Sequence, residues 1–211
     1  MPDNLSILPV LVAGGTSKRM GFDKAEFEIR GKPLWERQFE TLHALGLGKV
    51  AISIRNHRDW ELPDDAFWMY DEGDDMGPLA ALSAALVHYD YTHVLLLAVD
   101  MPSMDSDYLA GLIKDVKKGV GIVPLMGKYY DPLAAIYPLS VKPIVDGAIQ
   151  EGKYAFQSIT QSMVDEGLMK VTQVQPDQEI YFSNLNEPED IEGIAFKLGI
   201  SSVRGIPQQG R

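Results

Sequence analysis

Apolar and polar positions alternate along the first 120 residues in blocks that predict strands and helices in turn. Apolar runs typical of strands occur at residues 8–12, 49–54, 67–70 and 93–99. Helical periodicity occurs at residues 34–44, 80–89 and 106–116, and Ser106 is the expected N-cap of the last helix. The run at 93–99 is continuously apolar, as expected of a central parallel strand covered on both faces. This succession predicts βαβ units in an α/β fold, a three-layer, doubly wound and mostly parallel Rossmann-like sheet.

The second half of the chain carries a less regular pattern. Strands are expected at 120–124, 133–137 and 170–175, with a loop at 125–132. Helices are expected at 140–149, 155–165 and 187–198, and the polar residues 204–211 are expected to fray. No internal repeat, low-complexity tract or linker interrupts the sequence. We therefore expect a single domain over residues 1–211, with its ordered core at about 8–200.

Composition narrows the possible partners of the protein. The net charge of −11 over 211 residues argues against a nucleic-acid partner, because such a surface repels a phosphate backbone. No stretch approaches the ~20 apolar residues of a membrane span. The first residues lack the basic flank and apolar run of a signal peptide, so a cytoplasmic location is expected. The absence of cysteine excludes disulfides, thiolate nucleophiles and zinc–sulfur sites.

The most informative stretch follows the first predicted strand. Gly14 and Gly15 end that strand abruptly, and Lys18, Arg19 and Lys24 follow closely. Glycines let backbone N–H groups converge on an anion, and the cations supply the charge that a polyphosphate needs. The spacing matches neither a Walker A loop nor the dinucleotide fingerprint. The plain alternative is a strand-to-helix turn with a solvated basic segment, but the density of cations favours a phosphate site.

Two aspartates follow other predicted strands, and ligands in open parallel sheets bind beyond the carboxyl ends of the strands. Asp71 follows residues 67–70, and Asp100 follows the most apolar run. Asp100 is well placed to hold a hard cation such as Mg²⁺, although an isolated Asp-x-Pro is more often a turn or N-cap aspartate. The four histidines show no metal-ligand spacing, and no G-x-S-x-G occurs. The sequence therefore favours a polyphosphate and metal site over hydrolase chemistry.

These residues carry a family resemblance. The segment from Leu11 to Lys24, LVAGGTSKRMGFDK, resembles the nucleotide-binding motif of the molybdenum cofactor guanylyltransferases. The likeness continues in the family's order through GKPL at 31–34, GPLA at 77–80, DMP at 100–102, PLAAIY at 132–137 and NLNEPED at 184–190. It covers about residues 8–195. The resemblance implies a fold of the nucleotide-diphospho-sugar transferase type.

The resemblance also implies roles for individual residues. The residues that would contact GTP are Val12, Ala13, Gly14, Gly15, Lys24, Asp71 and Asp100. Within this set, Lys24 would bind the phosphates, with help from Arg19, and Asp100 would be the Mg²⁺ ligand. Asn184 and Asn186 fall where the family contacts its pterin substrate. Two positions depart from the family pattern: Ser53 or Arg55 stands where an asparagine is usual, and Ala81 replaces a glycine.

The expected reaction is transfer of GMP from GTP to the terminal phosphate of molybdopterin, with or without molybdenum, and release of pyrophosphate. A cytidylyltransferase, or another nucleotidyltransferase acting on a phosphorylated small molecule, is the first alternative. Gly15 and the Asp23-Lys24 pair favour guanine by resemblance alone. The second alternative is a non-catalytic nucleotide-binding regulator, which the two departures would suit. Transient contacts with other cofactor-biosynthesis proteins are expected only from the family.

Overall fold

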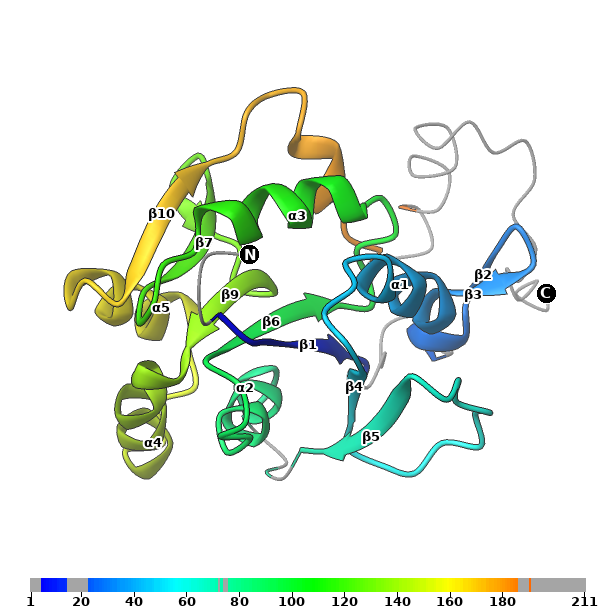
Figure 1. Cartoon of the computed structure of the whole chain (residues 1–211), viewed down its shortest axis with the longest axis horizontal. Coiled ribbons are helices and arrows are strands. Elements are labelled where there is room, and N and C mark those ends of the chain that lie inside the picture. Colours follow the sequence, from blue (N-terminus) through cyan, green and yellow to red (C-terminus); the bar gives the residue numbers. More distant parts are fainter. Residues whose placement is uncertain (1–4, 15–22, 72, 74–75, 186–189, 191–211) are drawn as a thin grey trace, which may run out of the picture.

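The computed structural model describes residues 5–14, 23–71, 73, 76–185 and 190, and a large sheet forms the centre of these residues (Figure 1). Seven strands are hydrogen-bonded in the order β10-β7-β9-β6-β1-β4-β5, and β8 pairs with β7. The strands of this sheet are β1 (Ile7–Val12), β4 (Val50–Ile54), β5 (Ala66–Tyr70), β6 (His93–Ala98), β7 (Gly121–Met126), β8 (Tyr129–Tyr130), β9 (Ala134–Pro138) and β10 (Met169–Gln173).

Helices cover both faces of the sheet and make the three predicted layers. The α-helices are α1 (Leu34–His43), α2 (Leu79–Ala85), α3 (Ser106–Asp115), α4 (Lys142–Gln150) and α5 (Phe156–Asp165). One apolar cluster joins α1 and α3 to the sheet, and a second joins α2, α4 and α5 to its other face. Alternate residues of β6 serve the two clusters: Leu95 and Leu97 face the first, and Val94 and Leu96 face the second. This arrangement explains why β6 is apolar throughout.

The sheet is mostly parallel, as predicted, and the exceptions concern β8 and β9. Strand β1 pairs in parallel with β4 and β6, β4 with β5, and β10 with β7. Strand β9 runs antiparallel to both of its neighbours, β6 and β7. The carboxyl ends of β1, β4, β5 and β6 therefore meet at one edge, and β9 brings its amino end to that same edge.

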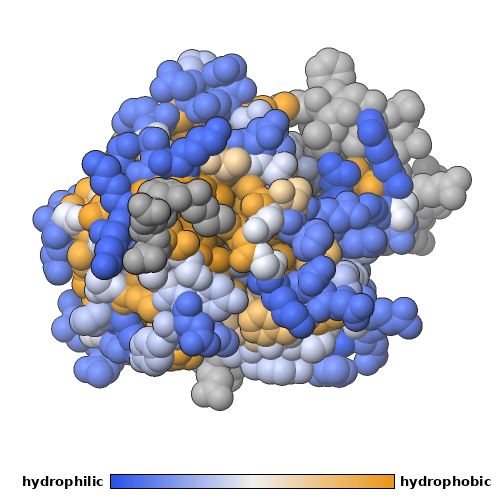
Figure 2. Space-filling view, in the orientation of Figure 1, coloured by the Kyte–Doolittle hydropathy of each residue, from blue (hydrophilic) through white to orange (hydrophobic). Residues whose placement is uncertain are grey.

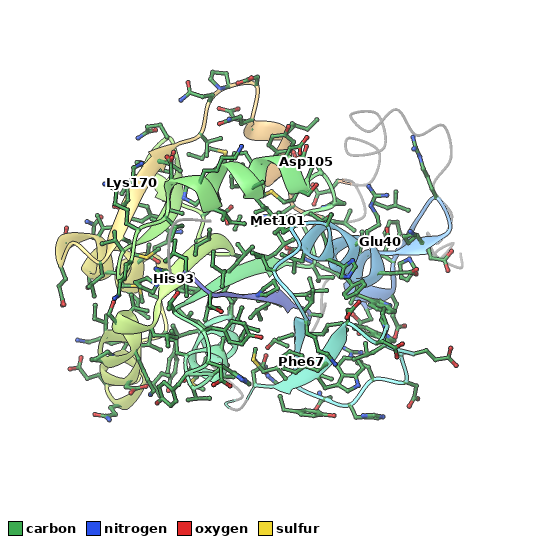
Figure 3. All side chains as sticks on the ribbon, in the orientation of Figure 1. Glu40, Phe67, His93, Met101, Asp105 and Lys170 are labelled. Carbon is green, nitrogen blue, oxygen red and sulfur yellow. The ribbon has the colours of Figure 1, made fainter. Side chains whose placement is uncertain are left out.

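Several predicted boundaries need correction. The N-cap of α3 is Asp105 and not Ser106, because the Asp105 carboxylate accepts the Tyr108 N–H at 2.8 Å (Figure 3). Helix α2 ends at Ala85, short of the predicted residue 89. The predicted loop at 125–132 contains β8, which forms a hairpin with β7.

A second, two-stranded sheet of β2 (Glu28–Ile29) and β3 (Lys32–Pro33) had no predicted counterpart. Short 3-10 helices are found at η1 (Lys24–Glu26), η2 (Leu139–Val141) and η3 (Glu179–Phe182). The predicted helix at 187–198 lies outside the described residues except for residue 190, and the tail at 204–211 lies outside them entirely.

The surface is strongly polar at its margins. On the face shown in Figure 2, hydrophilic residues dominate the periphery, and apolar residues gather toward the middle. Within the described ranges, no helix has both the length and the apolar character needed to cross a membrane.

Candidate nucleotide site

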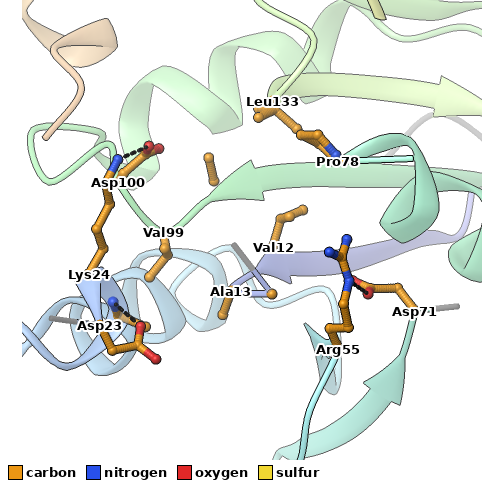
Figure 4. Close-up of a pocket in the computed structure, with 14 residues that line it drawn as sticks. Val12, Ala13, Asp23, Lys24, Arg55, Asp71, Pro78, Val99, Asp100 and Leu133 are labelled. Carbon is orange, nitrogen blue, oxygen red and sulfur yellow. Dashed lines mark hydrogen bonds and ion pairs between the residues drawn. The ribbon is translucent and has the colours of Figure 1, made fainter. Parts of the chain in front are cut away.

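A cavity of about 260 Å³ opens at the edge where the carboxyl ends of the parallel strands meet (Figure 4). It collects the predicted nucleotide residues that the structure describes: Val12, Ala13, Gly14, Lys24, Asp71 and Asp100. Arg55 and Leu133 also line it. These side chains come from the ends of β1, β4, β5 and β6, from the start of β9 and from the 3-10 helix η1. Segments more than eighty residues apart therefore form one site, as expected for an open parallel sheet.

Gly14 lets the strands meet closely at the centre of this edge. A Cβ atom placed on Gly14 would lie 3.0 Å from Asp71 Oδ2 and 3.2 Å from the Arg55 backbone nitrogen. The preceding residues are fixed from two sides, since the Ala13 N–H donates to the Ser53 carbonyl and the Val99 N–H donates to the Val12 carbonyl. The glycine is needed for steric room between neighbouring strand ends.

Lys24 and Asp100 form an ion pair at one end of the cavity. Lys24 Nζ lies 3.4 Å from Asp100 Oδ2, and both side chains are largely buried. Burial raises the pKa of the Asp100 carboxyl above its ordinary value, and the neighbouring Lys24 charge opposes that rise. Lys24 begins η1, and the carboxylate of Asp23 caps this turn by accepting the Ala25 N–H at 3.0 Å. The ion pair is therefore carried by a capped turn and by the end of β6.

The backbone after β6 is fixed by contacts from two distant segments. The Leu185 N–H donates to the Asp100 carbonyl at 2.8 Å. The Gln38 side-chain amide donates to the carbonyl of Met101, which Figure 3 shows beside α1. These bonds satisfy backbone groups that would otherwise be left open where the strand ends. The position of Asp100 is set by the fold rather than by a free loop.

Asp131 is a third carboxyl group near this end, and sequence reasoning missed it. Burial, together with the negative charge of Asp100, raises the pKa of the Asp131 carboxyl to about 6. Its Oδ1 accepts the Leu133 N–H at 3.2 Å just before β9. An Asp-Pro pair ahead of an apolar run was the available signal, but parallel-sheet reasoning looks only at the residues that follow strands.

Asp71 and Arg55 form a second ion pair at the other end of the cavity. Asp71 Oδ1 lies 3.7 Å from Arg55 Nε, and Asp71 Oδ2 accepts the Ser53 hydroxyl at 2.8 Å. The side chain of Asp71 is only 4% exposed. Both positions considered for the family's asparagine, Ser53 and Arg55, thus contact the same carboxylate.

The comparison with known proteins agrees with this geometry. The family model of the MobA-like NTP transferase domain matches residues 9–166, which contain every strand end that forms the cavity. The chain belongs to the MobA-like NTP transferase family.

Individual members of the MobA-like family match nearly the whole chain. A protein of Opitutus terrae named "Probable molybdenum cofactor guanylyltransferase" is 31% identical over 194 residues, covering 90% of this chain and 96% of its own. The molybdenum cofactor guanylyltransferase of Pseudomonas fluorescens SBW25 is 29% identical, covering 90% of this chain and 95% of its own. The resemblance predicted from the sequence is confirmed.

A solved structure in the same fold confirms the architecture. Molybdopterin-guanine dinucleotide biosynthesis protein A from Archaeoglobus fulgidus superposes with a TM-score of 0.71 at 23% identity. The match covers 90% of this chain and 97% of that one. This MobA-like chain therefore has the predicted α/β fold of the nucleotide-diphospho-sugar transferase type.

The remaining predicted site residues either do not line the cavity or lie outside the described residues. Asn184 is exposed and does not line the cavity, but it directly precedes Leu185, whose N–H binds the Asp100 carbonyl. Gly15, Arg19 and Asn186 lie outside the described residues. Ala81, the second departure from the family pattern, is fully buried in α2. A small side chain there suits the close packing of α2 on the sheet.

An aromatic cluster lies beside the segment that carries Lys24. The rings of Trp35 and Trp60 stack with centroids 4.9 Å apart, and Trp68 packs against Trp60 at 5.7 Å. Trp60 Nε1 donates to the Glu26 carboxylate in η1 at 3.2 Å. Arg58 lies over the Trp60 ring and pairs with Asp23. The loop after β4 is thereby tied to the η1 turn.

Proposed function

We propose that the protein transfers GMP from GTP to the terminal phosphate of molybdopterin, with release of pyrophosphate. The observation that carries this proposal is the convergence of Gly14, Lys24, Asp71 and Asp100 on one cavity in a chain of this family. The relatives are named molybdenum cofactor guanylyltransferase, and this name indicates both the group transferred and the cofactor that accepts it. The geometry supplies a cavity with cationic and anionic groups held at fixed places.

The reaction needs positioning more than proton transfer. A phosphate oxygen of the acceptor attacks the α-phosphorus of GTP and forms a new P–O bond. The bond from the α-phosphorus to the bridging oxygen breaks, and its electron pair leaves with pyrophosphate. A phosphate monoester is already largely ionised at neutral pH, so no general base is required. The residues of the cavity then act by orienting the reactants and by balancing charge.

The residues at the Lys24 end suit Mg²⁺ as a cofactor. Among the described residues, no group of three or more His, Cys, Asp or Glu side chains could form a protein cage for a metal. Mg²⁺ usually takes only one or two carboxylates and completes its shell with substrate phosphates and water. Asp100, a buried carboxylate in the cavity, fits that donor set and would hold the ion. The ion would offset negative charge on the phosphates.

The other residues would take the roles that the family resemblance implies. Lys24 would bind the phosphates of GTP, and Arg19 would add positive charge. The backbone of Val12, Ala13 and Gly14 would face the nucleotide at the end of β1. Asn184 and Asn186 would bind the pterin acceptor. Because Asn184 directly precedes Leu185, whose N–H binds the Asp100 carbonyl, the acceptor would then lie near Asp100.

The test is pyrophosphate release from each of the four nucleoside triphosphates with molybdopterin as acceptor. We expect release with GTP, dependent on both the acceptor and Mg²⁺. Equal or better turnover with CTP would replace the guanylyl assignment by the cytidylyl alternative. Tight binding of GTP without pyrophosphate release in the presence of acceptor would favour the non-catalytic regulator.

A further inference from the structure

The two ion pairs lie at opposite ends of the cavity. Asp100 follows β6 and Asp71 follows β5, and the strand order β6-β1-β4-β5 places three strand spacings between them. At the usual spacing this is about 14 Å. A nucleotide whose phosphates lie at Lys24 and Asp100 therefore extends its base toward Arg55 and Asp71. This orientation rests on the proposed function.

Asp71 presents an acceptor with unused capacity at that end. Its Oδ2 accepts the Ser53 hydroxyl, whereas Oδ1 has no hydrogen bond among the described residues. Arg55 Nε lies 3.7 Å from Oδ1, close enough for charge attraction but beyond hydrogen-bond distance. Leaving a buried carboxylate oxygen without a hydrogen bond is costly. A ligand that brings an N–H donor to Oδ1 would recover this cost.

Arg55 presents the complementary donor. Its side chain is 21% exposed, and Figure 4 shows the guanidinium directed into the cavity toward the space between Val12 and Pro78. The adjacent Asp71 carboxylate balances its charge. A donor and an acceptor held side by side with no net charge suit the edge of a neutral base better than a phosphate group.

We propose that Arg55 is a specificity-determining residue that reads the base of the nucleotide together with Asp71. Arg55 would donate to guanine O6, for which a guanidinium is a well-matched donor. Asp71 Oδ1 would accept from the N1–H and the 2-amino group on the same edge. Adenine and cytosine carry their acceptor and amino donor in the reverse order along that edge. The Arg55 donor would then face an amino donor, and the Asp71 acceptor would face a ring-nitrogen acceptor. The arginine that departs from the family pattern thereby becomes a source of guanine selectivity.

The test compares GTP with two analogues that change different parts of the base edge. Inosine triphosphate lacks the 2-amino group that faces Asp71. 2,6-Diaminopurine riboside triphosphate carries an amino group in place of O6 and so opposes Arg55, and its N1 carries no hydrogen for Asp71. Affinity for each is measured by calorimetry with the full chain, and turnover is measured by pyrophosphate release. The variants are Arg55→Met, Arg55→Lys and the control Arg37→Met on α1, a residue that does not line the cavity.

We expect the wild-type chain and Arg37→Met to prefer GTP to the diaminopurine analogue by well over about tenfold, because the analogue loses both the O6 contact to Arg55 and the N1–H contact to Asp71. Arg55→Met should lower that preference about tenfold, leave the part that Asp71 supplies through N1–H, and leave the preference of GTP over inosine triphosphate nearly unchanged. Arg55→Lys keeps the positive charge beside Asp71 but loses the planar fork, so it should lose most of the same preference at an unchanged melting temperature. If Arg55→Met does not fold, Arg55→Lys alone tests the role of Arg55.

An unaltered preference in both Arg55 variants would overturn the role of Arg55. The proposed function would stand in that case, provided that the wild-type chain still releases pyrophosphate from GTP. Conversely, a wild-type chain that discriminates the bases in calorimetry but releases no pyrophosphate would refute the transferase and leave the base-reading pair supported.

Discussion

The two ion pairs of the cavity look alike but are built differently. Asp71 is 4% exposed and receives a hydroxyl from Ser53 of β4, so the neighbouring strand holds it in place. Asp100 is 23% exposed, and its side chain pairs with Lys24 at 3.4 Å. Burial raises the pKa of Asp100, which means that the ionised form is only partly compensated.

This difference separates a fixed end of the site from an exchangeable one. At the Asp71 end, the Ser53 hydroxyl holds one carboxylate oxygen in place, and the other oxygen can accept a hydrogen bond from a ligand. At the Asp100 end, a lysine and a carboxylate neutralise each other until phosphate and a cation take their places. Chemistry that must bind and release charged groups is better served by the exchangeable pair. The following predictions test that distinction.

The largest effect is expected from breaking the exchangeable pair. Asp100→Asn removes the carboxylate charge, and Lys24→Met removes the ammonium. Each should lower the rate of pyrophosphate release by about 10²–10³, the usual cost of deleting an electrostatic group that stabilises a transition state. Steady-state assays at saturating GTP check this. Full Mg²⁺-dependent transfer by Asp100→Asn would refute its role as the metal ligand.

The next effect concerns pH and Asp131. The pKa of this carboxyl is raised to about 6 in the folded protein, above its ordinary 3.8. The folded state therefore binds more protons than the unfolded state between these values, and the free energy of unfolding should fall as the pH rises from about 4 to about 6. The expected loss is on the order of 2 kcal/mol.

Asp131→Asn isolates that contribution, because the amide oxygen can still accept the Leu133 N–H. Urea unfolding of both proteins at a series of pH values is the measurement. Between about pH 4 and about pH 6, the free energy of unfolding of the wild type should decrease relative to that of Asp131→Asn as the pH rises. Parallel curves would mean that Asp131 does not titrate differently in the folded state.

A smaller effect is expected at the fixed end from Gly14→Ala. The added Cβ would lie 3.0 Å from Asp71 Oδ2 and 3.2 Å from the Arg55 nitrogen, so the strand ends must separate. We expect GTP affinity to fall about tenfold, because forcing an extra methyl group into a packed site costs about 1–3 kcal/mol. Gly111→Ala on α3 is the matched control, since nothing lies within 4 Å of its Cβ position. It should bind GTP normally and be stabilised by about 0.5–1 kcal/mol.

The smallest effect is expected from Ser53→Ala. This substitution removes the hydroxyl that holds Asp71 Oδ2 and leaves a buried acceptor unpaired, at a cost of about 1 kcal/mol in stability. Thermal unfolding measures this cost, and the preference for GTP over inosine triphosphate should fall severalfold. A variant with wild-type stability and selectivity would show that Ser53 does not hold the carboxylate.

Much of the fold was predictable because its central strands are buried on both faces. The alternation of strands and helices over the first 120 residues indicated a doubly wound sheet, and the continuous apolar run of β6 indicated its central strand. The carboxyl-end rule brought Asp71 and Asp100 together. The direction of β9 was not predictable, because an apolar strand looks the same read in either direction. Asp131 was missed for that reason.

The N-cap of α3 and the contacts of Asp71 could not be predicted, because the sequence allows more than one local arrangement at each place. Asp105 and Ser106 are both good N-caps, and only the extended backbone of Asp105 decides between them. The contact of Ser53 and Arg55 with one carboxylate required knowledge of the register between β4 and β5, which the sequence alone does not specify. Roles for Arg19, Gly15 and Asn186 remain predictions from resemblance.

The stacked indoles described beside η1 give the molecule an internal optical signal. The chain has three tryptophans, and all of them, Trp35, Trp60 and Trp68, lie in that one cluster. Tryptophan fluorescence therefore reports on this corner alone, and Trp60 is joined through Glu26 to the turn that carries Lys24. A change in emission on mixing with ligand would time the rearrangement of the lysine turn without any added dye.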